Sequence, residues 1–360
     1  MRILVITHYS LQENTPRAFR ALELIKKMRQ DGYEIDVVEG KTRRAITDYQ
    51  EGMEALLDSQ SSVAQKRFKV LRKIGSVVIN YLYGDMVIAK YYRKTSKLIR
   101  SDRVYDAGIS IGQPFYTHMI LAFHARKLCR VKIADCGDPF YLNPKRQAPW
   151  WGVIQKKVFA KLDYICIPTP IAQKYYERYM QEEKIRIIPQ GVNFEAFHRK
   201  AYHPNDRVTF AYAGAFYKDI RDPRGFFDFL SGLDDDFCFV LFTDVNHVFY
   251  REALKTYVEK LGKKVEVRGL VTREECIQEL SGMDFLINLE NLSDIQAPSK
   301  LIDYGIAQRP VISFTSENFD KDIFMEFMRR NYEHGLQFDI SQFDIKNVAK
   351  QFESLIEGAV

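Results

Sequence analysis

A lysine at an unexpected helical position is the first residue of this sequence that suggests chemistry. Pro298 and Ser299 favour the first turn of a helix, and they follow an apolar, strand-like run that ends at Leu289. Lys300 would then lie in the first turn, where its cation opposes the helix dipole. The same cation is well placed if an anion binds in front of the helix. The alternative is an ordinary capped helix with a solvated lysine.

A second loop in the same half of the chain joins a glycine to two cations. Gly214 follows the predicted strand 208–213 directly, and a glycine there lets a ligand approach the backbone. Lys218 and Arg221 come next and could donate charge-assisted hydrogen bonds to phosphate oxygens. Two such loops at the carboxyl ends of two strands are what a nucleoside diphosphate requires.

Three further residues could complete a nucleotide site. Asp303 stands one turn after Lys300, so its carboxylate could accept hydrogen bonds from a ribose diol beside the diphosphate. Gly269 and Leu270 follow a third predicted strand and could offer backbone groups to the base.

The elements that must position these residues alternate along nearly the whole chain. Short apolar runs, which predict strands, are separated by amphipathic stretches, which predict helices. This alternation favours parallel sheets with helices on both faces, and it restarts once. We therefore predict an α/β protein of two Rossmann-like, doubly wound domains, 1–195 and 196–339, facing across a cleft in which ligands bind, with a C-terminal helix within 340–360 that packs back on the first domain.

The first half also carries candidate site residues. His118 opens a predicted helix after the strand 107–111, where it could bond a sugar hydroxyl or a phosphate, or simply cap or pack the helix. Asp135 and Asp138 follow another strand, and two carboxylates there need solvent or a ligand. We expect one of the two to be structural. The five cysteines are scattered without CxxC spacing, which indicates neither a zinc site nor a disulfide framework.

Several stretches together resemble retaining glycosyltransferases of the GT-B fold, close to family 4, of the kind that assemble bacterial polysaccharides and lipid-linked glycans. They are residues 1–9 and 13–18, Ile133–Pro139, Ile188–Asn193, and Pro298–Leu301 with Arg309–Ile312. The resemblance covers almost the entire chain. It implies an acceptor site in the first domain and, in the second, a donor site for a UDP- or GDP-linked sugar that requires no metal and no other cofactor.

The resemblance also sorts the candidate residues into roles. It implies catalytic roles for His118, Asp138 and Glu290. The residues that would bind the donor are Gly214, Lys218, Arg221, Gly269, Leu270, Asp294, Ser299, Lys300, Leu301 and Asp303. Many members of the family carry two glutamates separated by seven residues. Here Asp303 takes the second place and Ile295 the first, so Glu290 or Asp294 would have to replace the missing acid.

A basic segment suggests a further partner. Between Gln65 and Arg103 stand eleven lysines or arginines and two acids, interleaved with apolar runs and tyrosines. Such a segment, 65–103, is typical of a peripheral contact with an anionic membrane, or of solvated helices that cover a sheet. No recognition motif for nucleic acid accompanies the charge.

No stretch is long enough to span a bilayer, and residues 1–6 do not resemble a signal peptide. We therefore expect a cytoplasmic protein at or near the inner face of the membrane.

These observations favour an enzyme that moves a sugar, with retention, from a nucleoside diphosphate sugar to a saccharide or lipid-linked acceptor. Two alternatives stay open at this point. One is a nucleotide-sugar epimerase on the same scaffold. The other is a non-catalytic protein that binds a sugar nucleotide or a membrane in support of another transferase.

Overall fold

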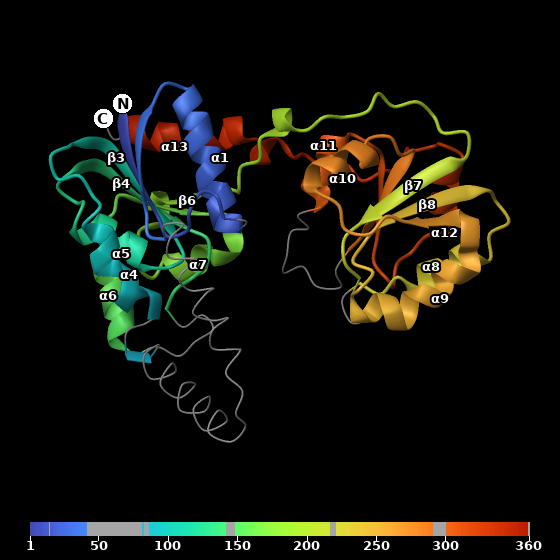
Figure 1. Cartoon of the computed structure of the whole chain (residues 1–360), viewed down its shortest axis with the longest axis horizontal. Helices are drawn as coiled ribbons and strands as arrows, with labels where there is room; N and C mark the ends of the chain where they lie inside the picture. The colour runs from blue at the N-terminus through green and yellow to red at the C-terminus, as the bar shows by residue number, and fades with distance from the viewer. Residues whose placement is uncertain are drawn as a thin grey trace, which may run out of the picture. The chain divides into compact units, whose positions relative to one another are not determined.

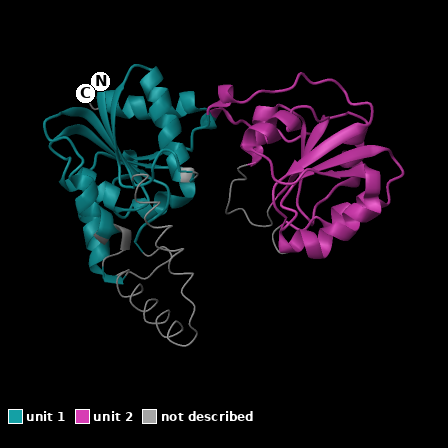
Figure 2. Cartoon of the chain, viewed as in Figure 1, with its two compact units in different colours: residues 1–192, 342–360 teal, residues 193–341 magenta. Residues whose placement is uncertain are grey.

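The computed structural model describes residues 1–13, 15–41, 81–82, 86–141, 148–216, 221–290 and 300–358. The chain divides into two compact units, which Figure 2 shows in separate colours. Unit 1 comprises residues 1–192 and 342–360, and unit 2 comprises residues 193–341. Each unit is built on its own parallel β-sheet (Figure 1). The predicted α/β class with two parallel sheets is therefore confirmed.

Unit 1 contains a six-stranded sheet in the order β2-β1-β3-β4-β5-β6, with every neighbouring pair parallel. The strands are β1 (Arg2–Thr7), β2 (Glu34–Glu39), β3 (Tyr105–Gly112), β4 (Cys129–Cys136), β5 (Tyr164–Ile167) and β6 (Ile185–Ile187). Successive side chains of a strand point to opposite faces, so Ile3 and Val5 enter one hydrophobic cluster and Leu4 and Ile6 another. This explains why β1 is apolar throughout.

Helices cover both faces of this sheet (Figure 1). They are α1 (Pro16–Gln30), α4 (Met86–Ser96), α5 (Tyr116–Phe123), α6 (Trp150–Phe159), α7 (Gln173–Tyr176) and α13 (Ile345–Glu357). Thr15 starts α1 by accepting the backbone N–H of Ala18, and Pro16 occupies the first turn. α1 and α13 pack together over one face, while α4 to α7 contribute to the cluster on the other.

Unit 2 contains a five-stranded parallel sheet in the order β11-β10-β7-β8-β9. The strands are β7 (Val208–Ala213), β8 (Phe237–Phe242), β9 (Val265–Val267), β10 (Phe285–Leu289) and β11 (Val311–Phe314). The helices are α8 (Arg224–Ser231), α9 (Lys255–Leu261), α10 (Arg273–Leu280), α11 (Lys300–Ala307) and α12 (Lys321–Met328). An aromatic core joins α8, α9 and α12 to one face of the sheet, and α10 and α11 pack on the other.

The chain leaves unit 1 at Val192 and re-enters it just before α13. The Val192 N–H donates to the Phe343 carbonyl at 2.8 Å, and the Ile345 N–H donates to the Val192 carbonyl at 3.0 Å. These bonds place the outgoing and returning segments side by side within unit 1, so α13 begins beside the point where the chain leaves this unit.

Two local elements differ from what the sequence pattern favours. The stretch 170–180 has the pattern of one helix, but it forms a 3₁₀ turn (Pro170–Ala172) and the short α7. α12 was not predicted, although Asp320 caps it by accepting from the Asp322 and Ile323 N–H groups.

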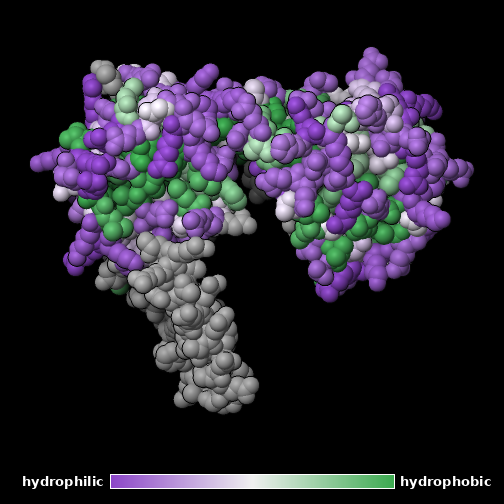
Figure 3. All heavy atoms as spheres, turned by 45° about the horizontal axis from the view of Figure 1, so that its top comes forward, coloured by the Kyte–Doolittle hydropathy of each residue, from purple (hydrophilic) through white to green (hydrophobic). Residues whose placement is uncertain are grey.

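Among the described residues, none of the helices combines the length and the apolar character needed to cross a bilayer. In Figure 3, hydrophilic residues cover most of the visible face of each unit, and hydrophobic residues appear in patches between them.

Candidate functional site

In each sheet the chain adds strands first on one side of its first strand and then on the other, so each sheet has a change of direction beside that strand. In unit 2 the first strand, β7, lies between β8 and β10, so the connections that follow β7 and β10 diverge. In unit 1, β1 lies between β2 and β3 in the same way. Ligands of open parallel sheets bind outside the carboxyl ends of the strands at such a point. Each unit therefore has one preferred place for a site.

Lys300 lies at this point of unit 2. Its ammonium group donates to the Leu289 carbonyl of β10 at 3.1 Å and to the Tyr212 hydroxyl of β7 at 3.3 Å. The nitrogen also lies 4.4 Å from the centre of the Tyr212 ring, within range of a cation–π contact. The lysine predicted from its helical position thus joins the two strands that flank the change of direction.

Tyr304, on the next turn of α11, fixes this helix to the same two strands. Its hydroxyl donates to the Ile287 carbonyl at 2.9 Å and accepts the Ala213 N–H at 3.0 Å, and its side chain is completely buried. Because both strands hold the helix, Lys300 is presented at a defined position on the sheet edge.

The electrostatic environment of Lys300 disfavours its charge. Burial and, to a smaller extent, the Arg221 cation lower its pKa to about 7, although the Glu290 carboxylate partly offsets both effects. Among the described residues, the hydrogen bonds of the ammonium group go to neutral oxygens. A bound anion would restore the charge, which is the behaviour expected of a phosphate-binding lysine.

Glu290 is held beside this lysine by a chain of polar groups. The Ser313 hydroxyl donates to Glu290 Oε1, and the Asn288 amide donates to the Ser313 hydroxyl at 2.6 Å. The Glu290 N–H donates to the Phe314 carbonyl at 2.9 Å. The carboxylate is therefore fixed from both β10 and β11. Ser313 carried no sequence signal for this role because its partner lies 23 positions away.

Asp303 is also at this edge, but it is already engaged. Arg273 donates to its Oδ1 from Nε at 2.8 Å and from Nη2 at 2.6 Å. Burial raises the pKa of Asp303, and Arg273 opposes that rise. Neither bond goes to Oδ2, so that oxygen can still accept a ribose hydroxyl.

The other predicted donor residues are distributed as follows. Gly214 and Gly269 have positive φ angles of 141° and 67°, so a side chain there would be strained. The Gly214 N–H donates to the Phe242 carbonyl, and Leu270 beside Gly269 is 76% exposed. Leu301 packs partly buried on α11. Lys218, Asp294 and Ser299 lie outside the described residues.

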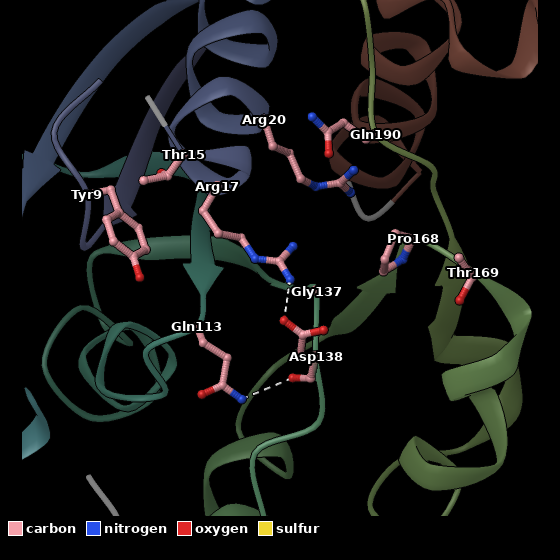
Figure 4. A pocket seen from close by; sticks show the side chains of 10 residues that line it. All are labelled: Tyr9, Thr15, Arg17, Arg20, Gln113, Gly137, Asp138, Pro168, Thr169 and Gln190. Atoms are coloured by element: carbon pink, nitrogen blue, oxygen red, sulfur yellow. Dashed lines mark hydrogen bonds and ion pairs between the residues drawn. The ribbon is translucent and has the colours of Figure 1, made fainter. Parts of the chain in front are cut away.

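Unit 1 has a pocket of about 670 Å³ at its own change of direction. Figure 4 shows side chains from α1 and from the loops after the strands converging on it. Its lining residues are Tyr9, Thr15, Arg17, Arg20, Gln113, Gly137, Asp138, Pro168, Thr169 and Gln190. Asp138 was a candidate from the sequence, whereas Arg17 and the uncharged polar residues were not.

The two arginines of this pocket have different environments. Arg20 is buried and donates to both oxygens of the buried Asp135, and it also donates to the carbonyls of Ile188 and Pro189. Arg17 donates to Asp138 Oδ2 at 2.7 Å, and this carboxylate is exposed. Of the two predicted acids, Asp135 therefore has the structural environment, and Asp138 faces the pocket.

His118, for which the sequence left a site role and a packing role open, is enclosed by protein groups. It is 3% exposed, with Nδ1 2.8 Å from the Ser110 hydroxyl and Nε2 3.5 Å from the Cys136 sulfur. Burial lowers its pKa to about 4, so the imidazole is neutral at pH 7. A neutral ring with both nitrogens facing protein groups argues for packing, the alternative considered for this residue, rather than for contact with a sugar.

Comparisons with known proteins support the architecture. No family model matches the chain, and no curated protein sequence matches it. Its structure is similar to a glycosyltransferase from Rickettsia africae ESF-5, at 13% identity and a TM-score of 0.61 over 99% of this chain and 98% of that one. Anabaena Alr3699/HepE in complex with UDP has 9% identity and a TM-score of 0.56 over 99% and 100%.

A third similar structure is the lipopolysaccharide outer core galactosyltransferase WaaB in its apo form. It has 13% identity and a TM-score of 0.52 over the whole of both chains. The chain has the GT-B fold. At such low identities the likeness shows the fold alone, and function has to be argued from the residues of the site.

Proposed function

We propose that this protein is a glycosyltransferase that takes a sugar from a nucleoside diphosphate sugar held by unit 2. The observation that carries the proposal is Lys300, whose half-buried cation lies at the N-terminus of α11 and at the change of direction of the sheet. Such a position suits a diphosphate, because a helix N-terminus and a lysine both attract anions. The structurally similar Anabaena protein binds UDP, which supports a uridine or similar nucleotide here.

The predicted donor residues take the following roles in this proposal. Lys300, Arg221 and Lys218 hold the diphosphate, and Gly214 lets it approach the backbone. Asp303 accepts from the ribose through Oδ2, and the backbone of Gly269 and Leu270 meets the base. Glu290 or Asp294 binds the sugar, and Ser299 and Leu301 also take part in donor binding. Metal is not required in this scheme, because cations and a helix end neutralise the leaving diphosphate.

The acceptor, a saccharide or a lipid-linked saccharide, binds in the pocket of unit 1. In the reaction the bond between the anomeric carbon and the diphosphate oxygen breaks, and a bond from that carbon to the acceptor oxygen forms. We propose retention of the anomeric configuration, with the acceptor's proton passing to the leaving phosphate. Asp138 faces the acceptor in this arrangement.

A thermal-shift screen with UDP, GDP, ADP, CMP and their sugar conjugates, with and without EDTA, tests the donor assignment. A ligand at a hundred times its Kd stabilises the native state by about 2.7 kcal/mol, which gives a clear shift in Tm. We expect one nucleotide to stabilise the protein equally in both conditions. The absence of any shift contradicts the donor site, and a shift abolished by EDTA contradicts metal independence.

Product analysis then separates the alternatives. A transferase consumes donor only when an acceptor is present, and NMR of the product reports the anomeric configuration. Conversion of the donor sugar without an acceptor indicates an epimerase, whereas tight donor binding without turnover on any acceptor indicates a non-catalytic partner protein.

The described part of the basic segment is compatible with contact at an anionic membrane. α4 buries Ile88 and Tyr91 and exposes Lys90, Arg93 and Lys94. Unit 1 also exposes apolar side chains: the ring of Trp150 contacts that of Tyr81, and the Trp150 indole N–H donates to the Leu82 carbonyl. Residues 65–80 and 83–85 lie outside the described residues. Co-sedimentation with anionic but not with zwitterionic vesicles is the expected result, and equal binding to both, or to neither, contradicts it.

A further inference from the structure

We propose that the pocket of unit 1 binds a phosphate group, carried by the saccharide that occupies it, with Arg17 as the principal ligand of that phosphate. The name acceptor for this saccharide rests on the proposed function. The preference of the pocket for a phosphate does not, because it follows from residues of unit 1 alone.

Arg17 lies where a cation needs an anion beside it, and in this structure the exposed Asp138 carboxylate supplies that anion. Arg17 stands in the first turn of α1, which contains no acidic residue, so its charge opposes the helix dipole. Its side chain is only 20% exposed, and it reaches into the pocket rather than into solvent (Figure 4). The same reasoning from helix position identified Lys300 in unit 2.

Gly137 provides the space that the Arg17 head group occupies. A Cβ atom at position 137 would lie 1.6 Å from both Cζ and Nη1 of Arg17. A side chain at this position would require the guanidinium to move. Gly137 therefore leaves room for the head group of Arg17, and guanidinium groups recognise phosphates through paired N–H donors.

Asp138 forms an ion pair with Arg17 that a ligand can displace. Its backbone is fixed, because its carbonyl accepts from Gln113 Nε2 and from the Tyr176 hydroxyl, both at 3.1 Å. Its carboxylate, in contrast, is 66% exposed and meets Arg17 through a single 2.7 Å bond. An ion pair with such an exposed carboxylate is weak, so a phosphate can displace it from the guanidinium. The carboxylate also repels an incoming anion, and its removal should strengthen binding.

The rest of the pocket suits a saccharide rather than a second charge. Arg20 is already neutralised by the buried Asp135, so the available positive charge of the pocket comes from Arg17. Thr169, Gln190 and Tyr9 add uncharged polar groups to the lining. A volume of about 670 Å³ holds a sugar with its phosphate.

Calorimetric titration with glucose 1-phosphate and with inorganic phosphate tests this inference, with methyl glucoside as the neutral control. The titrations use Lys300→Met protein, which lacks the main phosphate ligand proposed in unit 2. Arg17→Met should weaken both phosphate probes at least tenfold. Gly137→Ala should weaken them too, because its methyl group displaces the guanidinium, while Asp138→Asn should tighten them severalfold.

Arg100→Met is the matched control, since Arg100 forms an exposed pair with Asp102 and does not line the pocket. It should leave both Kd values unchanged, and near-UV circular dichroism should show that each variant is folded. The inference is overturned if Arg17→Met binds the phosphate probes as tightly as its Lys300→Met parent, or if Asp138→Asn binds them more weakly than that parent.

A competition experiment identifies the source of the phosphate. Glucose 1-phosphate is displaced either by other soluble sugar phosphates or by a short-chain polyprenyl diphosphate sugar, and either result supports the phosphate site. Displacement by the neutral glycoside alone overturns it. UDP binding to wild-type protein is measured separately, so loss of the donor assignment and loss of this inference are distinct results.

Discussion

The carboxyl edges of the two sheets present positive charge in different ways. In unit 1 both arginines of the pocket are paired with carboxylates, Arg17 with Asp138 and Arg20 with Asp135. In unit 2, among the described residues, Lys300 donates to neutral oxygens, and the neighbouring Arg221 cation disfavours its charge. The arginines of the unit 1 pocket therefore have counter-anions before any ligand binds. In unit 2, the surroundings of Lys300 lower its pKa instead.

This difference separates three roles for a cation at a sheet edge. Arg20 is buried with its acid and stabilises the fold. Arg17 is held by an exposed acid that a ligand can replace. Lys300 has no acid in direct contact among the described residues, and an anion would complete its environment. Removing each of these cations should therefore have a different effect, and the largest is expected for Arg20.

Arg20→Met should destabilise unit 1 by about 3–5 kcal/mol, because it leaves Asp135 buried at 1% exposure without its counterion. It also removes the donors to the Ile188 and Pro189 carbonyls just before the crossing to unit 2. Urea denaturation measures the change. The double variant Arg20→Met/Asp135→Leu should recover part of the loss, and a loss below about 1 kcal/mol in the single variant would show that the pair is not structural.

Donor affinity should fall about tenfold between pH 6 and pH 8, because the pKa of Lys300 is about 7 and binding requires the protonated form. Below pH 7 the cation is present before binding. Above pH 7 the free protein must first take up a proton, so affinity declines as pH rises. A nucleoside diphosphate sugar is the appropriate probe, since its diester phosphates stay ionised throughout this range.

Lys300→Arg is the matched control for this pH dependence, because arginine stays charged. The variant should bind the donor with nearly constant affinity from pH 6 to pH 8. An equally steep decline in this variant would assign the titration to another group.

Ser313→Ala should lower kcat about three- to tenfold while leaving the Kd for the nucleotide unchanged. The serine hydroxyl orients Glu290. In the proposed function this carboxylate contacts the sugar and not the diphosphate. Steady-state kinetics and nucleotide titration separate these effects. Ser354→Ala on α13 in unit 1 is the control, and an equal loss of nucleotide affinity in Ser313→Ala would contradict the separate roles.

The fold was largely predictable because strand and helix signals are local. β7 has the predicted bounds, 208–213, and β10 ends at the predicted Leu289, since each is a short apolar run. α12 was not predicted, because its amphipathic pattern is hard to distinguish between the polar segments on either side of it. The capping residue Asp320 is the clearest local sign of this helix.

A site residue could be predicted only where a single segment of the sequence contains all the residues that indicate its role. Lys300 could be identified from its own helix. Arg17 stands in a similar position, but its role becomes visible only with Gly137, which lies 120 positions later in the sequence and leaves room for its head group. For His118 the local signal left a site role and a packing role open. In the structure Gly112 leaves a space that the ring fills, since a Cβ there would lie 2.2 Å from Nε2. Such long-range packing cannot be derived from spacing.

The most direct test of the account is calorimetric titration of wild-type, Lys300→Met and Arg17→Met proteins with the nucleotide found in the thermal-shift screen. The account predicts that Lys300→Met weakens binding by roughly a hundredfold, about 2.7 kcal/mol, without lowering Tm, while Arg17→Met leaves the nucleotide Kd within about twofold of wild type. Wild-type affinity in Lys300→Met would contradict the assignment of the diphosphate to the edge of unit 2.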